Sequence, residues 1–188
     1  MSFFGDLFKK SKIDAVYEIK SPNSRVILTF MLDRGQISYY VKKDDKVILR
    51  QSRLGIALKD AAPLADGFGI VRAYSRMVDD TWKAYWGEQH VIRNNYNETA
   101  IYLEEIERPC RLLTLRFRVY DDGVAFRYEI PAQPEMKSMV ISDELTEFAV
   151  DVNSRSWSIP AYQPDRYEYE YVEHPVHTLT DSVHTPLT

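Results

Sequence analysis

Cysteine is almost absent from this chain of 188 residues, and its other scarce features narrow its class further. Because Cys110 is the single cysteine, the chain can form no internal disulfide and no thiolate-rich metal site. No apolar run approaches the length of a membrane span. The formal net charge of -4 argues against the basic face that phosphate binding requires. We therefore expect neither a membrane span nor a nucleic-acid partner.

The sequence also lacks the motifs of several enzyme classes. It has no phosphate-binding glycine loop, no G-x-S-x-G nucleophile elbow and no H-E-x-x-H metal motif. It shows no long helix and no repeat at solenoid spacing. The hydrophobic fraction of 45% and the charged fraction of 28% are those of a globular protein. Aromatic residues, at 13%, favour β structure.

The clearest pattern that is present lies in residues 111–131. Apolar and polar residues alternate there with the period of two that a half-buried strand requires. Asp121, Asp122 and Gly123 interrupt the alternation with residues suited to a tight turn, and it then resumes. The pattern predicts a β-hairpin at the centre of a sheet. Its apolar face comprises Leu113, Leu115, Phe117, Val119, Val124, Phe126, Tyr128 and Ile130.

Shorter runs of the same kind, separated by turn residues, predict an all-β sandwich of mainly antiparallel strands. We place this domain at residues 17–173, after a leader or tag-like segment at 1–16 and before a polar tail at 174–188. The clustered phenylalanines of residues 1–13 also fit a small amphipathic anchor, which we favour less. The other expected strands are 26–30, 37–41, 47–49, 52–58, 71–78, 99–104, 139–141 and 147–152.

A dense group of aromatic and acidic residues occupies positions 79–88. Trp82, Tyr85 and Trp86 could stack on the C–H face of a sugar ring, and Glu88 could accept hydrogen bonds from its hydroxyls. These four residues are our candidate substrate-binding set. The alternative is that the two tryptophans, spaced by four, anchor a loop in the core, and composition favours this alternative.

A second acidic group is the run of alternating tyrosine and glutamate at 167–171. On a strand, Glu168 and Glu170 would share one face and could offer oxygen ligands to a hard cation such as calcium. A solvated edge explains the spacing equally well and is the commoner case. Three histidines of the tail, at spacings of three and seven, could in principle bind a metal, but a solvated tail is again commoner: His174, His177 and His184.

Several motifs in one order resemble the N-terminal domain of glycoside hydrolase family 97. The resemblance covers roughly residues 17–171 and extends to the end of the chain at TPLT. The motifs are SRLG (52–55), DDTW (79–82), WGE (86–88), RNNYNE (93–98), FRVYDDGVAFRYE (117–129), DELTEF (143–148) and the Ile159-Pro160 step.

This resemblance implies a β-super-sandwich related to the galactose mutarotase fold, incomplete at its C-terminal end. Enzymes of the family include calcium-dependent α-glucosidases and α-galactosidases, some from starch-utilisation systems of gut bacteria. In them the sandwich precedes a catalytic (β/α)8 barrel, which carries both the acid and the second carboxylate that glycoside hydrolysis needs. The resemblance therefore implies an α-linked oligosaccharide and the barrel as partners, and a chain that is inactive alone.

The family resemblance also assigns a metal ligand. The first domain of these enzymes contributes a glutamate to the active-site calcium, and the matching position here is Glu168. Since the other ligands come from the barrel, we expect this chain alone to bind calcium weakly. The sequence does not distinguish glucose from galactose specificity, or retention from inversion.

Three departures from the family pattern shape the remaining expectations. Exported, periplasmic members begin with a signal peptide, whereas this chain begins with a charged segment. Ser158 occupies a position that is usually aromatic, although Trp157 precedes it. The family's sandwich continues past Thr188, which predicts open edges here. Two alternative functions are therefore a free-standing carbohydrate-binding module and a structural domain that is stable as a homo-oligomer.

Overall fold

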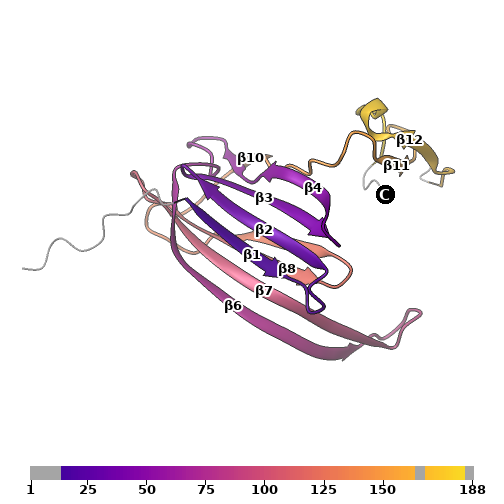
Figure 1. Ribbon diagram of the computed structural model, residues 1–188. Helices are drawn as coiled ribbons and strands as arrows, with labels where there is room; N and C mark the ends of the chain where they lie inside the picture. Colours follow the sequence, from indigo (N-terminus) through magenta and orange to yellow (C-terminus); the bar gives the residue numbers. More distant parts are fainter. Residues whose placement is uncertain (1–13, 164–167, 185–188) are drawn as a thin grey trace, which may run out of the picture. The chain divides into compact units, whose positions relative to one another are not determined.

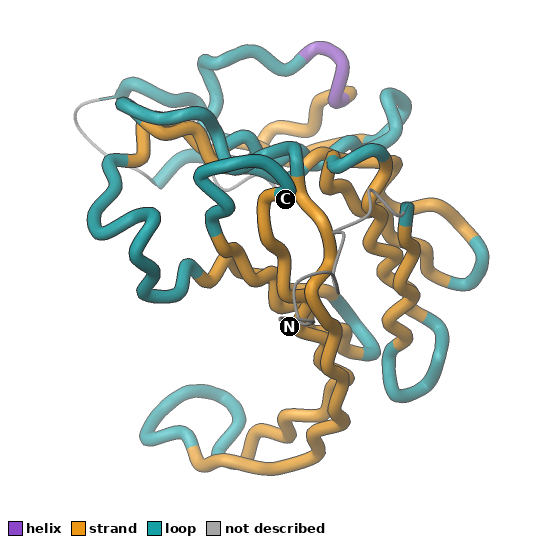
Figure 2. The backbone as a smooth tube through the Cα atoms, turned by 90° about the vertical axis from the view of Figure 1, so that its left-hand side faces the viewer, coloured by secondary structure: helices purple, strands orange, loops and turns teal. Residues whose placement is uncertain are grey.

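A computed structural model describes residues 14–163 and 168–184 of the chain (Figure 1). The chain divides into two compact units, Met1–Phe148 and Ala149–Thr188, which are described separately below. Over the described residues the regular elements are strands, apart from one short 3-10 turn, and Figure 2 shows this turn as the only helical segment drawn. The all-β prediction is confirmed. The expected segment at residues 1–13 lies outside the described residues.

The first sheet of the larger unit is an antiparallel meander in which each strand pairs with the next along the chain. Two tight turns have both central residues at positive φ, which matches the right-handed twist of the strands that they join. These turns are Arg34-Gly35 and Asp44-Asp45. The strands are β1 (Ala15–Lys20), β2 (Val26–Asp33), β3 (Gln36–Lys43) and β4 (Lys46–Arg53).

The second sheet has the order β6-β7-β8-β9 and is also antiparallel. The predicted hairpin forms its last two strands, but β9 lies at the edge, so the expectation of a central hairpin is wrong. The reason is that β7 pairs with both β6 and β8. The β6–β7 hairpin therefore extends the sheet beyond β8, and no described strand extends it beyond β9. The strands are β6 (Phe68–Lys83), β7 (Val91–Glu105), β8 (Leu112–Tyr120) and β9 (Val124–Glu129).

The core lies between these two sheets. Phe30 of β2 contacts Phe117 of β8 with ring centroids 5.9 Å apart, and Phe117 contacts Phe126 of β9 at the same distance. Tyr39 of β3 completes the group, with its ring 5.3 Å from that of Phe126. All four apolar residues predicted for the inner face of β8 are buried, which confirms the alternation: Leu113, Leu115, Phe117 and Val119.

Several strand boundaries differ from those that the sequence predicts. The expected strand at 52–58 is interrupted, because the Gly55 N–H donates to the Tyr128 hydroxyl and β5 (Ile56–Leu58) begins after it. That short strand pairs with β10 (Ile141–Glu144). The strand expected at 139–141 therefore shares only residue 141 with the strand that forms. The strand expected at 147–152 is wrong. The Glu147 carbonyl instead accepts a hydrogen bond from the Tyr39 hydroxyl, at 3.0 Å.

The smaller unit is a short antiparallel hairpin followed by a turn. Strand β11 (Arg155–Ser158) pairs with β12 (Val172–Pro175), and the 3-10 turn η1 (Val176–Thr178) follows. The domain boundaries expected at residues 16 and 173 stay predictions. Across the described ranges, no helix is long and apolar enough to cross a membrane.

Gly35 joins the two sheets at one end of the sandwich. Its carbonyl accepts a hydrogen bond from the Phe68 N–H at the start of β6, at 3.1 Å. Its φ is +88°, and a Cβ atom there would lie 3.0 Å from the backbone nitrogen of Gly67. Gly67 also has a positive φ, +73°, but a Cβ atom at that position would meet nothing within 4 Å.

We expect Gly35→Ala to destabilise the protein clearly more than Gly67→Ala. Both changes impose left-handed strain of about 1–2 kcal/mol, but only the first adds a backbone clash. Urea unfolding followed by circular dichroism would measure both free energies of unfolding. Equal losses would show that the close approach of Gly35 to Gly67 contributes nothing to stability.

Candidate functional site

The aromatic and acidic segment forms the outer end of the β6–β7 hairpin. β8 pairs with β7 only as far as Tyr96, whereas β6 continues alongside β7 to the pair Lys83–Val91. Beyond Tyr96 the hairpin is therefore a two-stranded ribbon, and Figures 1 and 2 show its loop extending away from the other strands. The Ala84 N–H donates to the His90 carbonyl at 2.9 Å and closes this loop.

The aromatic side chains of this ribbon point into solvent. Trp82 is 54% exposed, Tyr85 96% and Trp86 87%, so the alternative that the tryptophans anchor a loop in the core is wrong. The rings of Tyr85 and Trp86 are 6.3 Å apart and tilted by 44°. They offer separate faces for stacking instead of one flat platform. Glu88, in the same loop, is exposed.

A bidentate ion pair stiffens the ribbon below these rings. Arg93 of β7 donates from Nε to Oδ1 of Asp79, at 2.8 Å, and from Nη2 to Oδ2, at 2.7 Å. The hydrogen bonds to Arg93 lower the pKa of the Asp79 carboxyl below its ordinary value. The Asp79 carboxylate is thus already engaged, whereas Asp80 and Glu88 are the other acidic residues of the segment at 79–88 and both are exposed.

The candidate calcium ligand lies in the smaller unit. Glu168 is exposed and precedes β12, so the alternating run is not a strand over residues 168–171; Tyr167 lies outside the described residues. Within the described ranges, Glu168 has no ion-pair partner, and no three histidine, cysteine or acidic side chains gather as a metal site. An exposed carboxylate fits a hard cation, but calcium takes six to eight oxygen ligands. Glu168 could therefore supply only one part of such a site.

The histidines and the cysteine do not add a second site. The three tail histidines form no metal-binding group with each other or with other described residues. His177 instead contacts the Val152 carbonyl, at 3.2 Å from Nδ1. Cys110 is half-buried and has a free thiol in the turn before β8.

A buried carboxylate beneath three arginines is the main polar cluster that the sequence analysis missed. Glu98 of β7 is 1% exposed and accepts hydrogen bonds from Arg76 Nε at 2.8 Å, Arg116 Nη1 at 2.9 Å and Arg118 Nε at 2.8 Å. Burial alone would raise the pKa of Glu98, but these hydrogen bonds outweigh it and lower the pKa to about 2. The alternation along 111–131 shows that the two β8 arginines share a face, but not that Glu98 lies between them.

Glu129 of β9 extends this cluster. It accepts two hydrogen bonds from Arg116, at 2.6 and 2.9 Å, and one from Arg127 at 2.8 Å. The hydrogen bonds from Arg116, and then those from Arg127, lower the pKa of Glu129 to about 2. Both carboxylates therefore remain charged throughout the physiological range, and neither can act as a general acid at neutral pH.

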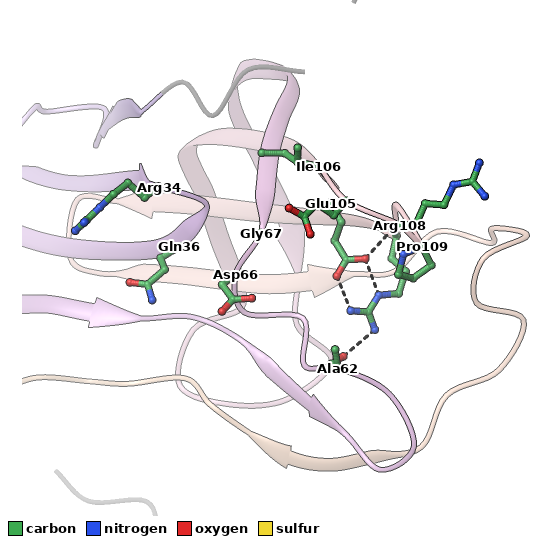
Figure 3. Close-up of a pocket in the computed structure, with 11 residues that line it drawn as sticks. Arg34, Gln36, Ala62, Asp66, Gly67, Glu105, Ile106, Arg108 and Pro109 are labelled. Carbon is green, nitrogen blue, oxygen red and sulfur yellow. Dashed lines mark hydrogen bonds and ion pairs between the residues drawn. The ribbon is translucent and has the colours of Figure 1, made fainter. Parts of the chain in front are cut away.

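A cleft of about 610 Å³ lies at the other end of β6 from the aromatic ribbon (Figure 3). Its wall includes the buried pair Arg111–Glu105, in which Arg111 Nε lies 2.8 Å from Oε2. Arg111 also donates from Nη1 to the Ala62 carbonyl at 2.8 Å. Arg34, Asp66 and Arg108 line the cleft, but it contains no aromatic ring. The buried pair holds the end of β7 to the start of β8, which is a structural role.

The glycosyl-hydrolase 97 N-terminal family matches this chain over residues 19–188. The chain belongs to this family. A family 97 enzyme from Pseudoalteromonas sp. strain K8 has the same fold, with a TM-score of 0.82 and 30% identity, both as a glutamate-to-glutamine variant in complex with panose and as the enzyme in complex with acarbose. The match covers 91% of this chain and 26% of that enzyme. This family 97 domain therefore spans about a quarter of the length of the enzyme.

A second solved structure shares the fold alone. A β-arabinopyranosidase matches with a TM-score of 0.74 and 22% identity, covering 83% of this chain and 26% of its own.

We expect Glu98→Gln to lower the free energy of unfolding at pH 7 by about 1–3 kcal/mol, because three arginines lose a charged partner. The pKa of Glu98 in the folded state, about 2, is below its ordinary 4.5, so the stabilisation is complete above pH 4.5 and is lost as the pH falls towards 2. Urea unfolding followed by circular dichroism would measure the free energy of unfolding between pH 7 and pH 2.5. This free energy should fall less over that range in Glu98→Gln than in the wild type.

The matched control for this experiment is Glu18→Gln, which changes an exposed carboxylate on β1. It should alter stability by no more than about 0.5 kcal/mol. Parallel pH profiles for the wild type and Glu98→Gln would contradict the assignment of the acid sensitivity to this cluster.

Proposed function

We propose that this family 97 domain forms one wall of the active site of an α-glycosidase that hydrolyses α-glucosides or α-galactosides, and presents Glu168 to a calcium ion there. The observation that carries the proposal is the family match over residues 19–188, together with the 0.82 TM-score to an enzyme studied with panose and acarbose. Panose consists of α-linked glucose units, which supports the α-glucoside class. Catalysis requires two carboxylic groups flanking the glycosidic bond, and in our proposal both belong to a catalytic barrel.

The geometry of the described residues agrees with a supporting role. Glu98 and Glu129, whose pKa values are lowered to about 2, are held by arginines and have no proton to donate at neutral pH. Glu168, by contrast, is exposed and unpaired within the described ranges. In this arrangement calcium, when bound, would supply Lewis-acid stabilisation of charge at the substrate. The part played by Glu168 would be to hold one coordination position.

The isolated chain should show no hydrolysis of p-nitrophenyl α-glucoside or p-nitrophenyl α-galactoside above the blank. A colorimetric assay with calcium present would measure this. A rate that Glu168→Gln abolishes would show that the chain itself is catalytic and would overturn the proposal.

A chimera would test the calcium role directly. The chain would replace the matching region of the Pseudoalteromonas enzyme, and calcium affinity would be measured by calorimetry and by calcium-dependent thermal shift. We expect Glu168→Gln to weaken calcium binding by about 10-fold or more, because a ligand oxygen is replaced by a neutral amide. Glu170→Gln, which changes an exposed carboxylate in the same segment, is the control. Equal effects of the two changes would refute the assignment of Glu168.

A second candidate function is carbohydrate binding by the chain alone, and the exposure of Trp82, Tyr85 and Trp86 favours it. Affinity electrophoresis in gels containing α-glucans should then show retardation that Trp86→Ala reduces, because stacking on an aromatic ring contributes to sugar binding. Trp157→Ala, at a tryptophan that is 44% exposed in the smaller unit, is the matched control. Unretarded migration in every α-glucan would eliminate this function.

A further inference from the structure

The outer edge of β6 has no pairing partner within the described residues. The strand spans 16 residues, from Phe68 to Lys83, and pairs only with β7, at the outer side of its sheet (Figure 1). The Phe68 N–H at its start donates to Gly35, but residues 72–78 alone, at about 3.3 Å per residue, present edge N–H and C=O groups over roughly 20 Å. Natural proteins protect such edges with lysine, proline, bulges or short strands. The register of β6 against β7 shifts between Ile70 and Arg72, which leaves an irregularity at Val71. Beyond it, residues 72–78 contain neither lysine nor proline and pair regularly with β7, so this stretch is open to a further strand.

The sheet face beside this edge is basic, although the whole chain has a net charge of -4. The register sets Arg72 opposite Tyr102, Tyr74 opposite Ala100 and Arg76 opposite Glu98. Each of these three pairs continues across the sheet to facing residues of β8 and β9, and the three rows so formed contain five arginines and two glutamates. The arginines are Arg72, Arg76, Arg116, Arg118 and Arg127, and the glutamates are Glu98 and Glu129.

The arginines nearest the edge are held in place. The Arg72 guanidinium lies 4.1 Å from the centroid of the Tyr102 ring, which is a cation–π contact. Arg76 engages Glu98 through Nε, and its side chain remains 48% exposed. Tyr74, between them on the same face, is 59% exposed. Because these side chains are already ordered, a partner that binds them loses little conformational entropy.

We propose that an extended acidic polypeptide segment adds as a strand to the free edge of β6, with carboxylates opposite Arg72 and Arg76 and an apolar residue opposite Tyr74. Arg72 and Arg76 are four residues apart on one face, so the partner carries its carboxylates at positions i and i+4. Backbone hydrogen bonds supply the affinity and the paired charges select the register. Arginine and tyrosine are also the residues enriched in binding hot spots.

Charge complementarity favours this occupant over a second copy of the chain. Antiparallel pairing of two β6 edges about Tyr74 would set Arg72 of each copy opposite Arg76 of the other, and like charges in that position are destabilising. An anionic polysaccharide would satisfy the arginines, but it would not use the open backbone of the edge. The experiment below separates these three occupants.

The probe is a capped peptide, Thr-Glu-Thr-Val-Thr-Glu-Thr, titrated into the isotopically labelled chain at low salt. We expect shifts of the β6 amide signals, and slower exchange at alternating amides of residues 71–78, because every second N–H points away from β7. The same peptide with lysine in place of glutamate should bind about 10-fold more weakly or worse. Lack of both effects at about 1 mM peptide would overturn the proposal.

Charge reversal tests the role of the two arginines. The double change Arg72→Glu and Arg76→Glu should reverse the preference, so that the lysine peptide binds better than the glutamate peptide. Arg34→Glu reverses one charge at the exposed β2–β3 turn, as Arg72→Glu does on β6, and should leave the preference unaltered. If the double variant does not fold, the same comparison of the two peptides is made with Arg72→Glu alone, because this change leaves the contacts of Glu98 intact.

Three results would overturn the proposal even if an anionic probe binds. Glutamate-peptide binding without protection of β6 amides would show contact with the face and not with the edge. Heparin that displaces the glutamate peptide, and binds the wild type at least as tightly as that peptide does, would indicate a polyanionic saccharide site. Dimers detected by light scattering, with the same amides protected in the absence of peptide, would assign the edge to a second copy of the chain.

Discussion

The contact between the two four-stranded sheets is the interaction on which the rest of this structure depends. Phe117 touches Phe30 of the opposite sheet and Phe126 of its own, and all these rings lie between the layers. Because the inner faces of β2, β3 and β8 are apolar, the polar residues of β8 must face outward. That requirement puts Arg116 and Arg118 beside Glu98 and makes the outer face of the sheet basic. The apolar core thus decides where the charge lies.

The overlap of the sheets also decides which strand remains uncovered. β1 and β2 lie against β7 and β8, and β6 contacts only its neighbour β7 to a notable extent among the described strands. Met77, on the inward side of β6, is accordingly 85% exposed. The same arrangement leaves the aromatic ribbon in solvent. The length of the β6–β7 hairpin thus underlies the exposure of the candidate sugar-binding rings, whereas the open edge follows from the terminal place of β6 in its sheet.

Local pattern predicts the fold class well, because a period of two is visible over a few residues. The hairpin at 111–131 is found as β8 and β9, since its alternation is regular and its turn contains Gly123. The position of that hairpin in the sheet, and the break at Gly55, depend on which strands pair across long stretches of sequence. The exposure of Trp82 and Trp86 is not visible locally for the same reason. Composition favours the alternative that they anchor a loop in the core, and only the pairing of β6 with β7 beyond the end of β8 places them in solvent.

The candidate site is less predictable than the fold. Glu98 lies in a motif that points to the family, but its contact with three arginines follows from the register of three strands. The alternating run raises Glu168 and Glu170 equally, and only the family resemblance selects Glu168, because an exposed carboxylate has no distinguishing local pattern.

The distribution of indole rings has a practical consequence for spectroscopy. The three tryptophans, Trp82, Trp86 and Trp157, are 54%, 87% and 44% exposed, whereas the aromatic residues at the sheet interface are phenylalanine and tyrosine. Intrinsic emission excited at the red edge of the absorption band therefore originates from water-exposed chromophores and carries little information about the interior. The same property makes Trp82 and Trp86 sensitive reporters for quenchers that approach the tip of the β6–β7 hairpin.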